Sequence, residues 1–396
     1  MKTLAYIICY LIYPFSFLVP RSKKQLVFGS YRGSFSDNSK YLYLYALEHL
    51  KDMQVSWVSI NRHTVKRLHS LGLPAYWLLS PIGILKALRA KYWFVSAYTS
   101  DIMYCLSGKA TVVNLWHGVG LKFCEFNITH GPLADRYVKQ TFKERFYHPE
   151  CFRRPEYVLS STECQTRMMS TAFRVPVERC MELGYPRNAI LNLSKEQVRS
   201  FVQKYEPVET LQLIDKISKF DTVYIYMPTW RDSQKNVFAQ HMDLRKLSQV
   251  LAAQNAVLLL KPHPNTVVDS IYQADNLILL DRTIDIYGVL PFTDVLITDY
   301  SSILYDYLLI PNKQVILYLY DYEEYVRERD FYYPFSENVV GKRVITFENL
   351  LKVIEEQNYK MSEQERIFIL SKFWGDTMNK DVCANILRQL NITCEA

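Results

Sequence analysis

The sequence predicts an α/β protein built from two doubly wound parallel sheets. Short apolar runs alternate with polar, helix-length segments, and the alternation stops near residues 194–219 and then starts again. The chain of 396 residues also has room for about two domains of ordinary size. We therefore expect two Rossmann-like domains with a cleft between them, and ligands beyond the carboxyl ends of the strands.

The composition bounds the class of protein. Half of the residues are apolar (49%) and 22% are charged, which excludes a disordered or fibrous chain. The net charge of +7 is compatible with an anionic partner such as a phosphorylated substrate, a lipid headgroup or nucleic acid. The eight cysteines form no CxxC pair, which favours reduced thiols over a zinc site or a disulfide framework.

The amino terminus is a candidate membrane segment. Residues 3–20 carry no charge, and Arg21, Lys23 and Lys24 follow them. The stretch is marginally long enough to cross a bilayer, but Pro14 would kink or end a helix there. We expect a membrane-associating helix that lies on or crosses the bilayer, with the basic residues on the cytoplasmic side. A buried core helix is the alternative.

A second apolar, aromatic segment covers residues 76–94 and is interrupted by Lys86, Arg89 and Lys91. Helices on a membrane surface have this composition, and so do helices packed on a sheet. Both interpretations stay open at the level of sequence.

The apolar runs locate the expected strands. The first set is at residues 25–28, 55–60, 92–96, 111–115, 157–160 and 180–183. The second set is at residues 222–226, 257–260, 277–280, 295–298 and 315–319. The restart gives three parts: a membrane-associating segment (1–22), an amino-terminal domain (23–195) and a carboxy-terminal domain (196–396). The last helix is expected to pack back on the first domain.

A histidine follows one strand end of the first domain. The run 111–115 leads into WHGVGLK, residues 116–122. Its glycines allow a tight turn and close approach of the backbone to a ligand. A histidine held at such a place can act as a general base near neutral pH. His117 is therefore a catalytic candidate and Lys122 a candidate cation for phosphate, the alternative for His117 being a structural role.

Two strand ends of the second domain are basic. One is followed by MPTWRD, in which Thr229 and Arg231 are candidate ligands for phosphate oxygens. The next is followed by KPHP, in which two prolines stiffen the backbone around His263, two residues after Lys261. We expect both loops to stabilise charge on phosphate. The alternatives are a surface ion pair at Arg231 and an exposed proline turn.

Hydroxyl groups mark another strand end of the second domain. Asp299, Ser301 and Ser302 precede a helical pattern over residues 303–309. One of these side chains would cap that helix, whose amino terminus suits a diphosphate. In the first domain, Arg187 follows the last expected strand, and it either reaches phosphate or braces the connection between the domains.

The order of these motifs is informative. WHGVGLK, PTWRD, KPHP and TDYSSILYDY together resemble the CDP-glycerol:glycerophosphotransferase family, whose members build teichoic acids and related phosphate-linked capsule polymers. The likeness also includes SDNSKY (36–41) and GYPRN (184–188), so it covers most of the chain. It implies a GT-B-like fold, a CDP-activated polyol donor, transfer without a metal or other cofactor, and peripheral attachment to the cytoplasmic face of the cell membrane.

The resemblance also implies roles for single residues. His117 matches the base that deprotonates the acceptor hydroxyl, and His263 matches a second essential histidine beside the donor diphosphate. Ser301 and Ser302 match hydroxyls that bind this diphosphate, with Arg231 as a helper. The first domain would then take the acceptor and the second the nucleotide donor.

The expected activity is transfer of glycerol phosphate from CDP-glycerol to a hydroxyl of a lipid-linked or glycan acceptor, with release of CMP. Three alternatives remain: a CDP-ribitol donor, a nucleotide-sugar glycosyltransferase of the same architecture, and a membrane-associated nucleic-acid-binding protein. The basic residues are dispersed and no DNA or RNA motif is present. No nucleic-acid partner is therefore expected.

Overall fold

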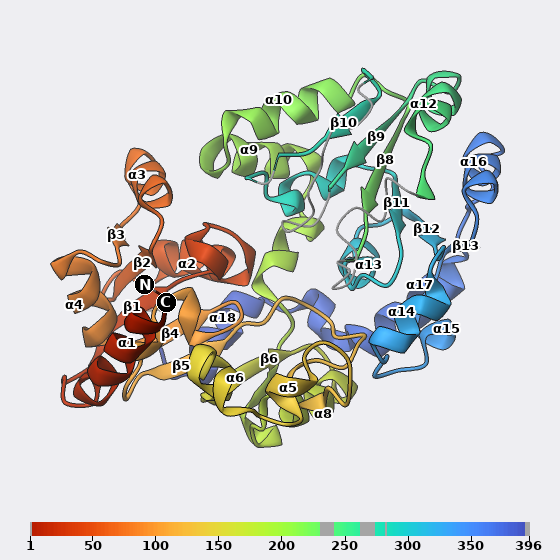
Figure 1. The fold of residues 1–396 in the computed structure, drawn as a ribbon. Coiled ribbons are helices and arrows are strands. Elements are labelled where there is room, and N and C mark those ends of the chain that lie inside the picture. Colours follow the sequence, from red (N-terminus) through yellow and green to blue (C-terminus); the bar gives the residue numbers. More distant parts are fainter. Residues whose placement is uncertain (1, 230–240, 262–273, 282, 393–396) are drawn as a thin grey trace. The chain divides into compact units, whose positions relative to one another are not determined.

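The computed structural model describes residues 2–229, 241–261, 274–281 and 283–392 (Figure 1). The chain divides into two compact units. Unit 1 consists of Met1–Val119, Phe123–Ala189 and Trp374–Ala396, and unit 2 consists of Gly120–Lys122 and Ile190–Phe373. Each unit contains one parallel sheet with helices, which is the fold class predicted from the alternating pattern.

The sheet of unit 1 has seven strands in the order β3-β2-β1-β4-β5-β6-β7. Their bounds are β1 (Ser22–Phe28), β2 (Gln54–Ser59), β3 (Ala75–Trp77), β4 (Ala90–Val95), β5 (Thr111–Asn114), β6 (Tyr157–Ser160) and β7 (Cys180–Glu182). All neighbouring pairs are parallel. The winding reverses between β1 and β4, so the switch point where such folds bind ligands is beyond the carboxyl ends of these two strands.

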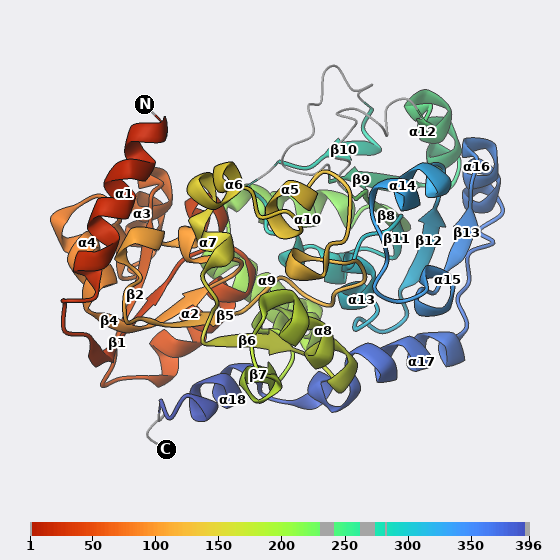
Figure 2. The same cartoon turned by 60° about the horizontal axis from the view of Figure 1, so that its bottom comes forward.

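The helices of unit 1 connect these strands. They are α1 (Lys2–Ser16), α2 (Asp37–His49), α3 (Arg62–Ser70), α4 (Pro81–Arg89), α5 (Ala134–Tyr137), α6 (Phe142–Tyr147), α7 (Pro149–Phe152), α8 (Glu163–Phe173) and α18 (Val382–Gln389). Figures 1 and 2 show α1 and α4 side by side at one end of the sheet. The apolar face of α4 and the end of α1 cover a core cluster that includes Trp93, Val95 and Cys105.

Helix α1 is formed by the uncharged amino-terminal stretch, and Pro14 lies inside it. The ring of Tyr13 stacks on that of Tyr104 with 4.5 Å between centroids, and Ser16 accepts a hydrogen bond from the Gly108 N–H at 3.0 Å. Its other side is apolar and exposed: Leu4, Ile7, Ile8, Leu11, Ile12 and Phe15. In the described ranges, no helix has the length and apolar character needed to cross a bilayer.

Arg21 was expected to be one of the basic residues that flank a membrane segment, but its side chain is bonded inside unit 1. Its guanidinium is half-buried and donates to four backbone carbonyls, those of Ala87, Ala90, Leu106 and Gly108, at 2.5–3.0 Å. Burial lowers the pKa of this group to about 10. Arg21 therefore ties the chain after α1 to two other segments of unit 1, residues 87–90 and 106–108, whereas Lys23 and Lys24 on β1 are exposed.

The aromatic stretch 76–94 does not form one helix. It is divided into the end of β3, the nine-residue helix α4 and most of β4. Ser80 caps α4 by accepting from the Gly83 N–H, and Pro81 occupies the first turn. The helix interpretation of this segment is correct only for Pro81–Arg89, which packs on the sheet.

The sheet of unit 2 has six parallel strands in the order β10-β9-β8-β11-β12-β13. Their bounds are β8 (Thr222–Met227), β9 (Ala256–Leu260), β10 (Leu277–Leu279), β11 (Val295–Thr298), β12 (Gln314–Tyr318) and β13 (Lys342–Val344). The described helices are α9 (Lys195–Tyr205), α10 (Val208–Ile217), α12 (Leu244–Ala252), α13 (Ile303–Tyr307), α14 (Tyr322–Glu328), α15 (Phe335–Asn338), α16 (Phe347–Glu355) and α17 (Glu363–Phe373). Here the winding reverses between β8 and β11.

The end of the chain belongs to unit 1. Asp381 caps α18 by accepting from the Ala384 N–H at 3.0 Å, and Tyr45 of α2 donates to its carboxylate at 3.2 Å. Tyr92 of β4 donates to the Leu390 carbonyl at 3.4 Å. The segment that follows α17 therefore packs on α2 and β4.

Candidate active site

His117 lies in a turn directly after β5. The backbone enters the left-handed region at Trp116 (φ 52°) and again at Gly118 (φ 110°). A positive φ is strained for a bulky residue such as Trp116, so the surrounding contacts must hold this turn. The His117 side chain is exposed, and its ring is 3.8 Å from the Trp116 ring, centroid to centroid.

Two distant segments hold the backbone of this turn. Asn38, fully buried at the start of α2, donates through Nδ2 to the carbonyls of Leu115 (3.3 Å) and Trp116 (2.8 Å). Arg187 donates to the His117 carbonyl at 2.7 Å. The two segments are also joined to each other, because the Asn38 Oδ1 accepts from the Arg187 N–H at 3.0 Å. We call Asn38 and Arg187 the turn clamp.

Asp37 completes the clamp electrostatically. Its carboxylate accepts from the Arg187 guanidinium at 2.8 Å, and the Arg187 side chain is only 10% exposed. A charge-assisted hydrogen bond of this kind fixes a side chain more firmly than a neutral hydrogen bond does. Arg187, which the sequence assigned either to phosphate or to the domain connection, is thus placed against the His117 turn.

Buried polar groups also order the neighbouring strand ends. Asn114 accepts from the Trp116 N–H at 2.9 Å and donates to the Ala97 carbonyl at 2.7 Å, which joins the ends of β4 and β5. The Asp101 carboxylate accepts from the Ser96 and Ala97 N–H groups at 2.9 and 2.8 Å. Burial raises the pKa of Asp101 to about 7, although these hydrogen bonds act in the opposite direction.

Lys122 has its described contacts within unit 2. It belongs to unit 2, where its Nζ donates to the Tyr325 hydroxyl at 3.0 Å and lies 5.5 Å from the centre of that ring. Residue 122 also forms an antiparallel bridge with Phe331. Lys122 stays a candidate cation for phosphate, and the chain returns to unit 1 at Phe123.

In unit 2, the ends of β8 and β11 meet at the switch point. Asp299, 1% exposed, accepts through Oδ1 from the Thr229 N–H at 2.8 Å and from the Tyr300 N–H at 2.6 Å. Thr298 donates to the Met227 carbonyl at 2.7 Å. Two of the predicted residues, Thr229 and Asp299, are therefore in direct contact where such sheets bind their ligands.

The helix after Ser302 is shorter than its apolar pattern suggested. It covers only Ile303–Tyr307, and Ser302 at its N-cap makes no capping hydrogen bond through its side chain. Ser301 and Ser302 are half-buried. The expected side-chain cap is absent, because Asp299 instead bonds the N–H groups of Thr229 and Tyr300.

Lys261 is held by backbone carbonyls. Its Nζ donates to Asp281 O at 2.9 Å and to Ile284 O at 3.1 Å. Burial lowers the pKa of Lys261, and the nearby carboxylates of Asp285 and Asp281 oppose this shift. The remaining predicted site residues, Arg231 and His263, lie outside the described residues.

The clamp was not found from the sequence. SDNSKY was noted as a motif without a role for Asn38, and nothing local indicates that its amide reaches a turn more than 75 residues away. A buried asparagine next to an acidic residue at a helix start is a signal of a polar network, but its partners are set by tertiary structure.

Comparison with known proteins gives a consistent result. A family model described as CDP-Glycerol:Poly(glycerophosphate) glycerophosphotransferase matches residues 11–388. A teichoic acid glycerol-phosphate transferase from Staphylococcus aureus is 29% identical over 359 residues, which cover 88% of each chain. A teichoic acid ribitol-phosphate polymerase, TarK, from the same organism is 26% identical, covering 87% of this chain and 64% of that protein.

Among solved structures, that of the wall teichoic acid polymerase TagF is similar in fold. Its TM-score is 0.75 at 23% sequence identity, and the match covers 99% of this chain and 96% of that chain. This confirms the two doubly wound domains predicted from the sets of strands and the GT-B-like fold that the family resemblance implied.

Proposed function

This chain belongs to the CDP-glycerol:poly(glycerophosphate) glycerophosphotransferase family, and from this premise we propose that it transfers glycerol phosphate from CDP-glycerol to a hydroxyl of a lipid-linked or glycan acceptor. The resemblance inferred from the motif order is thereby confirmed, as is the enzyme class: a transferase of phosphate-containing groups that uses a CDP-alcohol. The product would be a teichoic-acid-like or capsule polymer, and CMP would be released.

The proposed reaction is a direct displacement at phosphorus. The acceptor oxygen attacks the β-phosphorus of CDP-glycerol, a new P–O bond forms, and the bond to the bridging oxygen breaks so that CMP leaves with that electron pair. The imidazole of His117 takes the proton of the attacking hydroxyl. One observation carries this role: an exposed imidazole at a strand end, on a strained turn that the clamp holds by its backbone.

The donor is assigned to unit 2. The contact between Thr229 and Asp299 at the β8–β11 switch point supports this assignment. Ser301 and Ser302 follow directly and would bind the diphosphate, together with Lys261, Arg231 and His263. For Arg231 and His263 the support is the motif order alone.

Helix α1 supports attachment to the cytoplasmic face of the cell membrane. Its exposed apolar side chains include Leu4 (61% exposed), Leu11 (65%) and Phe15 (67%). Side chains of this kind on one helix favour the interface between headgroups and acyl chains. Tyr6 and Tyr10 are on the opposite side of the helix, where their rings pack on Phe146. Lys23 and Lys24 would face anionic headgroups.

A CDP-ribitol donor is the second candidate. The similarity to a protein described as a ribitol-phosphate polymerase favours it, and no described residue separates a three-carbon from a five-carbon polyol.

The test uses the full chain with CDP-glycerol or CDP-ribitol and a bacterial membrane extract as the source of acceptor. We expect CMP from CDP-glycerol and an acceptor that gains the mass of one glycerol phosphate per CMP. Preference for CDP-ribitol would establish the second candidate. Release of a nucleoside diphosphate from a nucleotide sugar, with no CMP from either CDP-alcohol, would overturn the proposal.

A further inference from the structure

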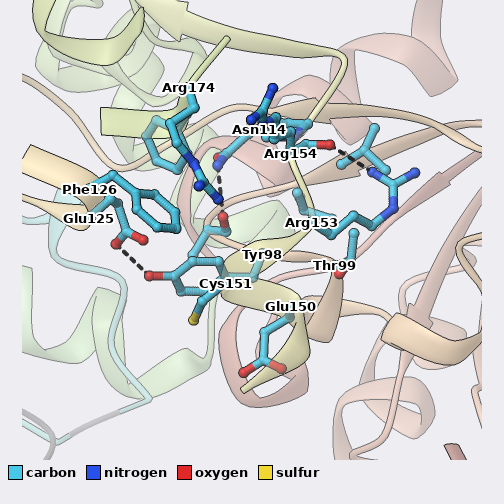
Figure 3. A pocket seen from close by; sticks show the side chains of 15 residues that line it. Tyr98, Thr99, Asn114, Glu125, Phe126, Glu150, Cys151, Arg153, Arg154 and Arg174 are labelled. Atoms are coloured by element: carbon cyan, nitrogen blue, oxygen red, sulfur yellow. Dashed lines mark hydrogen bonds between the residues drawn. The ribbon is translucent and has the colours of Figure 1, made fainter. Parts of the chain in front are cut away.

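Unit 1 contains a pocket that the proposed mechanism does not use. Its enclosed space is small, about 20 Å³, and it opens to solvent. Its wall is formed by the ends of β4 and β5, by the segment around α7 and by the end of α8 (Figure 3). The polar side chains labelled there come from Tyr98, Thr99, Asn114, Glu125, Glu150, Arg153, Arg154 and Arg174.

Two of the three arginines carry uncompensated charge. Arg153 pairs with Glu156 at 3.5 Å and donates to the carbonyls of Ser107 and Ala110. In the part of the chain that the structure describes, Arg154 and Arg174 form no ion pair with a carboxylate. Arg174 lies 3.4 Å from the centre of the Phe126 ring instead. Burial lowers the pKa of Arg174, and the positive charges of Arg154 and Arg145 lower it further.

The two carboxylates of the pocket already have partners. Glu125 is buried and accepts from the Tyr98 hydroxyl at 2.5 Å, and desolvation raises its pKa. Glu150 lies 3.5 Å from the ring of His148. In Figure 3, Arg154 and Arg174 lie at one end of the pocket and Glu150 at the other. One end of the pocket therefore has a net positive charge.

A buried hydroxyl in the same wall lacks a partner. Thr99 is 3% exposed, and its Oγ1 has no hydrogen-bond partner among the described residues. The Nε of Arg174 is also buried without one. Buried donors are almost always satisfied in folded proteins, and leaving one unsatisfied costs about 1–3 kcal/mol. An oxygen-rich ligand in the pocket would accept from these groups.

The pocket adjoins the His117 turn through two of its lining residues. Asn114 accepts from the Trp116 N–H at 2.9 Å. Phe173 packs edge-on against the Trp116 ring at 4.8 Å, and that ring in turn contacts His117. A group bound in the pocket would thus be one layer of side chains away from the proposed base.

We propose that this pocket binds a phosphate group of the acceptor, behind the hydroxyl that is extended. The inference rests on the proposed function, in which every transfer creates a phosphodiester, so an acceptor that has been extended once carries phosphate near its end. Guanidinium groups fork onto two phosphate oxygens, and a hydroxyl donor completes such a site. Arg154 and Arg174 supply the guanidinium groups, and Thr99 supplies a hydroxyl nearer the Glu150 end of the pocket (Figure 3).

The kinetic test compares two synthetic acceptors with the same terminal glycerol hydroxyls. Glycerophosphoglycerol contains a phosphodiester, and diglycerol contains an ether in its place. In Arg154→Gln, Arg174→Gln and the double variant, we expect the KM for glycerophosphoglycerol to rise, by ten-fold or more in the double variant. The KM for CDP-glycerol and turnover of diglycerol should not change. Arg179→Gln, an exposed arginine elsewhere in unit 1, is the matched control.

A binding measurement separates this inference from the proposed function. Glycerophosphoglycerol is titrated into the full chain without any CDP-alcohol, and binding is followed by calorimetry or by the ³¹P resonance. Weaker binding in Arg154→Gln, whose exposed side chain can be changed without unfolding, and still weaker binding in the double variant support the site, even if the wild-type protein does not turn over CDP-glycerol.

Two results would overturn the inference. The first is equal binding and equal KM in wild-type, double-variant and Arg179→Gln proteins that share one melting temperature. The second is loss of binding to vesicles with 30% anionic phospholipid in the double variant while glycerophosphoglycerol still binds as in the wild type. In that case the arginines would serve a lipid headgroup and not the acceptor.

Discussion

The two units have the same winding but use their strand ends differently. Both sheets run outward from a switch point, between β1 and β4 in unit 1 and between β8 and β11 in unit 2. In unit 1, side chains from distant segments bond the backbone of the turn after β5 and leave the His117 side chain exposed. In unit 2, Asp299 and Lys261 themselves bond the backbone of their loops. The same topology thus presents an exposed imidazole in one unit and strand ends joined by buried polar side chains in the other.

The largest effect is expected for His117 in unit 1. Replacing His117 by alanine removes the proposed base and should lower kcat by about 10²–10⁴-fold, with CDP-glycerol binding retained. The measurement is CMP release at saturating donor. His63→Ala, an exposed histidine on α3, serves as the control. Wild-type turnover in His117→Ala would refute the assigned role and remove the functional contrast between the units.

The next effect tests whether the clamp positions the turn. Asn38→Ala removes two donated hydrogen bonds and one accepted bond in a fully buried place, which costs about 1–3 kcal/mol of folding free energy. We expect kcat to fall by roughly ten-fold or more and the KM for CDP-glycerol to stay constant. Denaturant unfolding and steady-state kinetics measure the two effects.

Asn38→Asp is the informative companion. It keeps an acceptor for the Arg187 N–H but places a buried carboxylate oxygen against the Trp116 carbonyl, so stability should fall at least as far as in Asn38→Ala, and kcat should fall with it. A variant in which stability falls and kcat does not would show that the clamp serves folding alone.

A smaller effect is expected for Asp299 in unit 2. Asp299→Ala removes the acceptor shared by the Thr229 and Tyr300 N–H groups. The loosened strand ends should raise the KM for CDP-glycerol by about ten-fold, corresponding to about 1.4 kcal/mol. Asp299→Asn retains a carbonyl oxygen at the same place and should behave nearly as the wild type. If Asn is as impaired as Ala, the negative charge itself is required and Asp299 is not only a brace.

The smallest effect concerns pH and Asp101 in unit 1. Its folded-state pKa, about 7, is above its ordinary value of 3.8. The folded protein therefore holds the proton more tightly than the unfolded chain, and stability is lost as pH rises through 7. Between pH 6 and 8 we expect a loss of about 1 kcal/mol. Asp101→Asn should flatten this slope in a melting series, and an unchanged slope would assign it to other groups.

Sequence reasoning found the parts of the fold that depend on local apolar pattern. The runs that became β5, β6 and β11 match the strands to within one residue, because buried parallel strands are continuous apolar stretches. It missed β3 and β13, which have three residues each and lie at sheet edges. β7 and β10 are equally short edge strands, and they were predicted because residues 277–280 and most of 180–183 are apolar. β13 begins with two basic residues and offers no such run.

In the site, too, the features with a local sequence pattern were predicted and those without one were not. Strand-end reasoning placed His117 directly after β5 and Thr229 and Asp299 at the ends of β8 and β11, because parallel sheets bring polar residues to their carboxyl edge. It did not show that Lys122 contacts Tyr325 of unit 2, which is about 200 residues away in the sequence. The clamp and the arginine pocket depend on contacts between distant segments, and no local pattern encodes these.

Arg21 fixes the orientation of α1 relative to the sheet of unit 1. Because one guanidinium fastens the exit of this helix to the carbonyls around residues 87–90 and 106–108, α1 cannot swing independently of the sheet it leads into. Any surface that binds the helix therefore also sets the orientation of the whole β1–β7 sheet. The distance between the His117 turn and that surface is then set by the fold of unit 1.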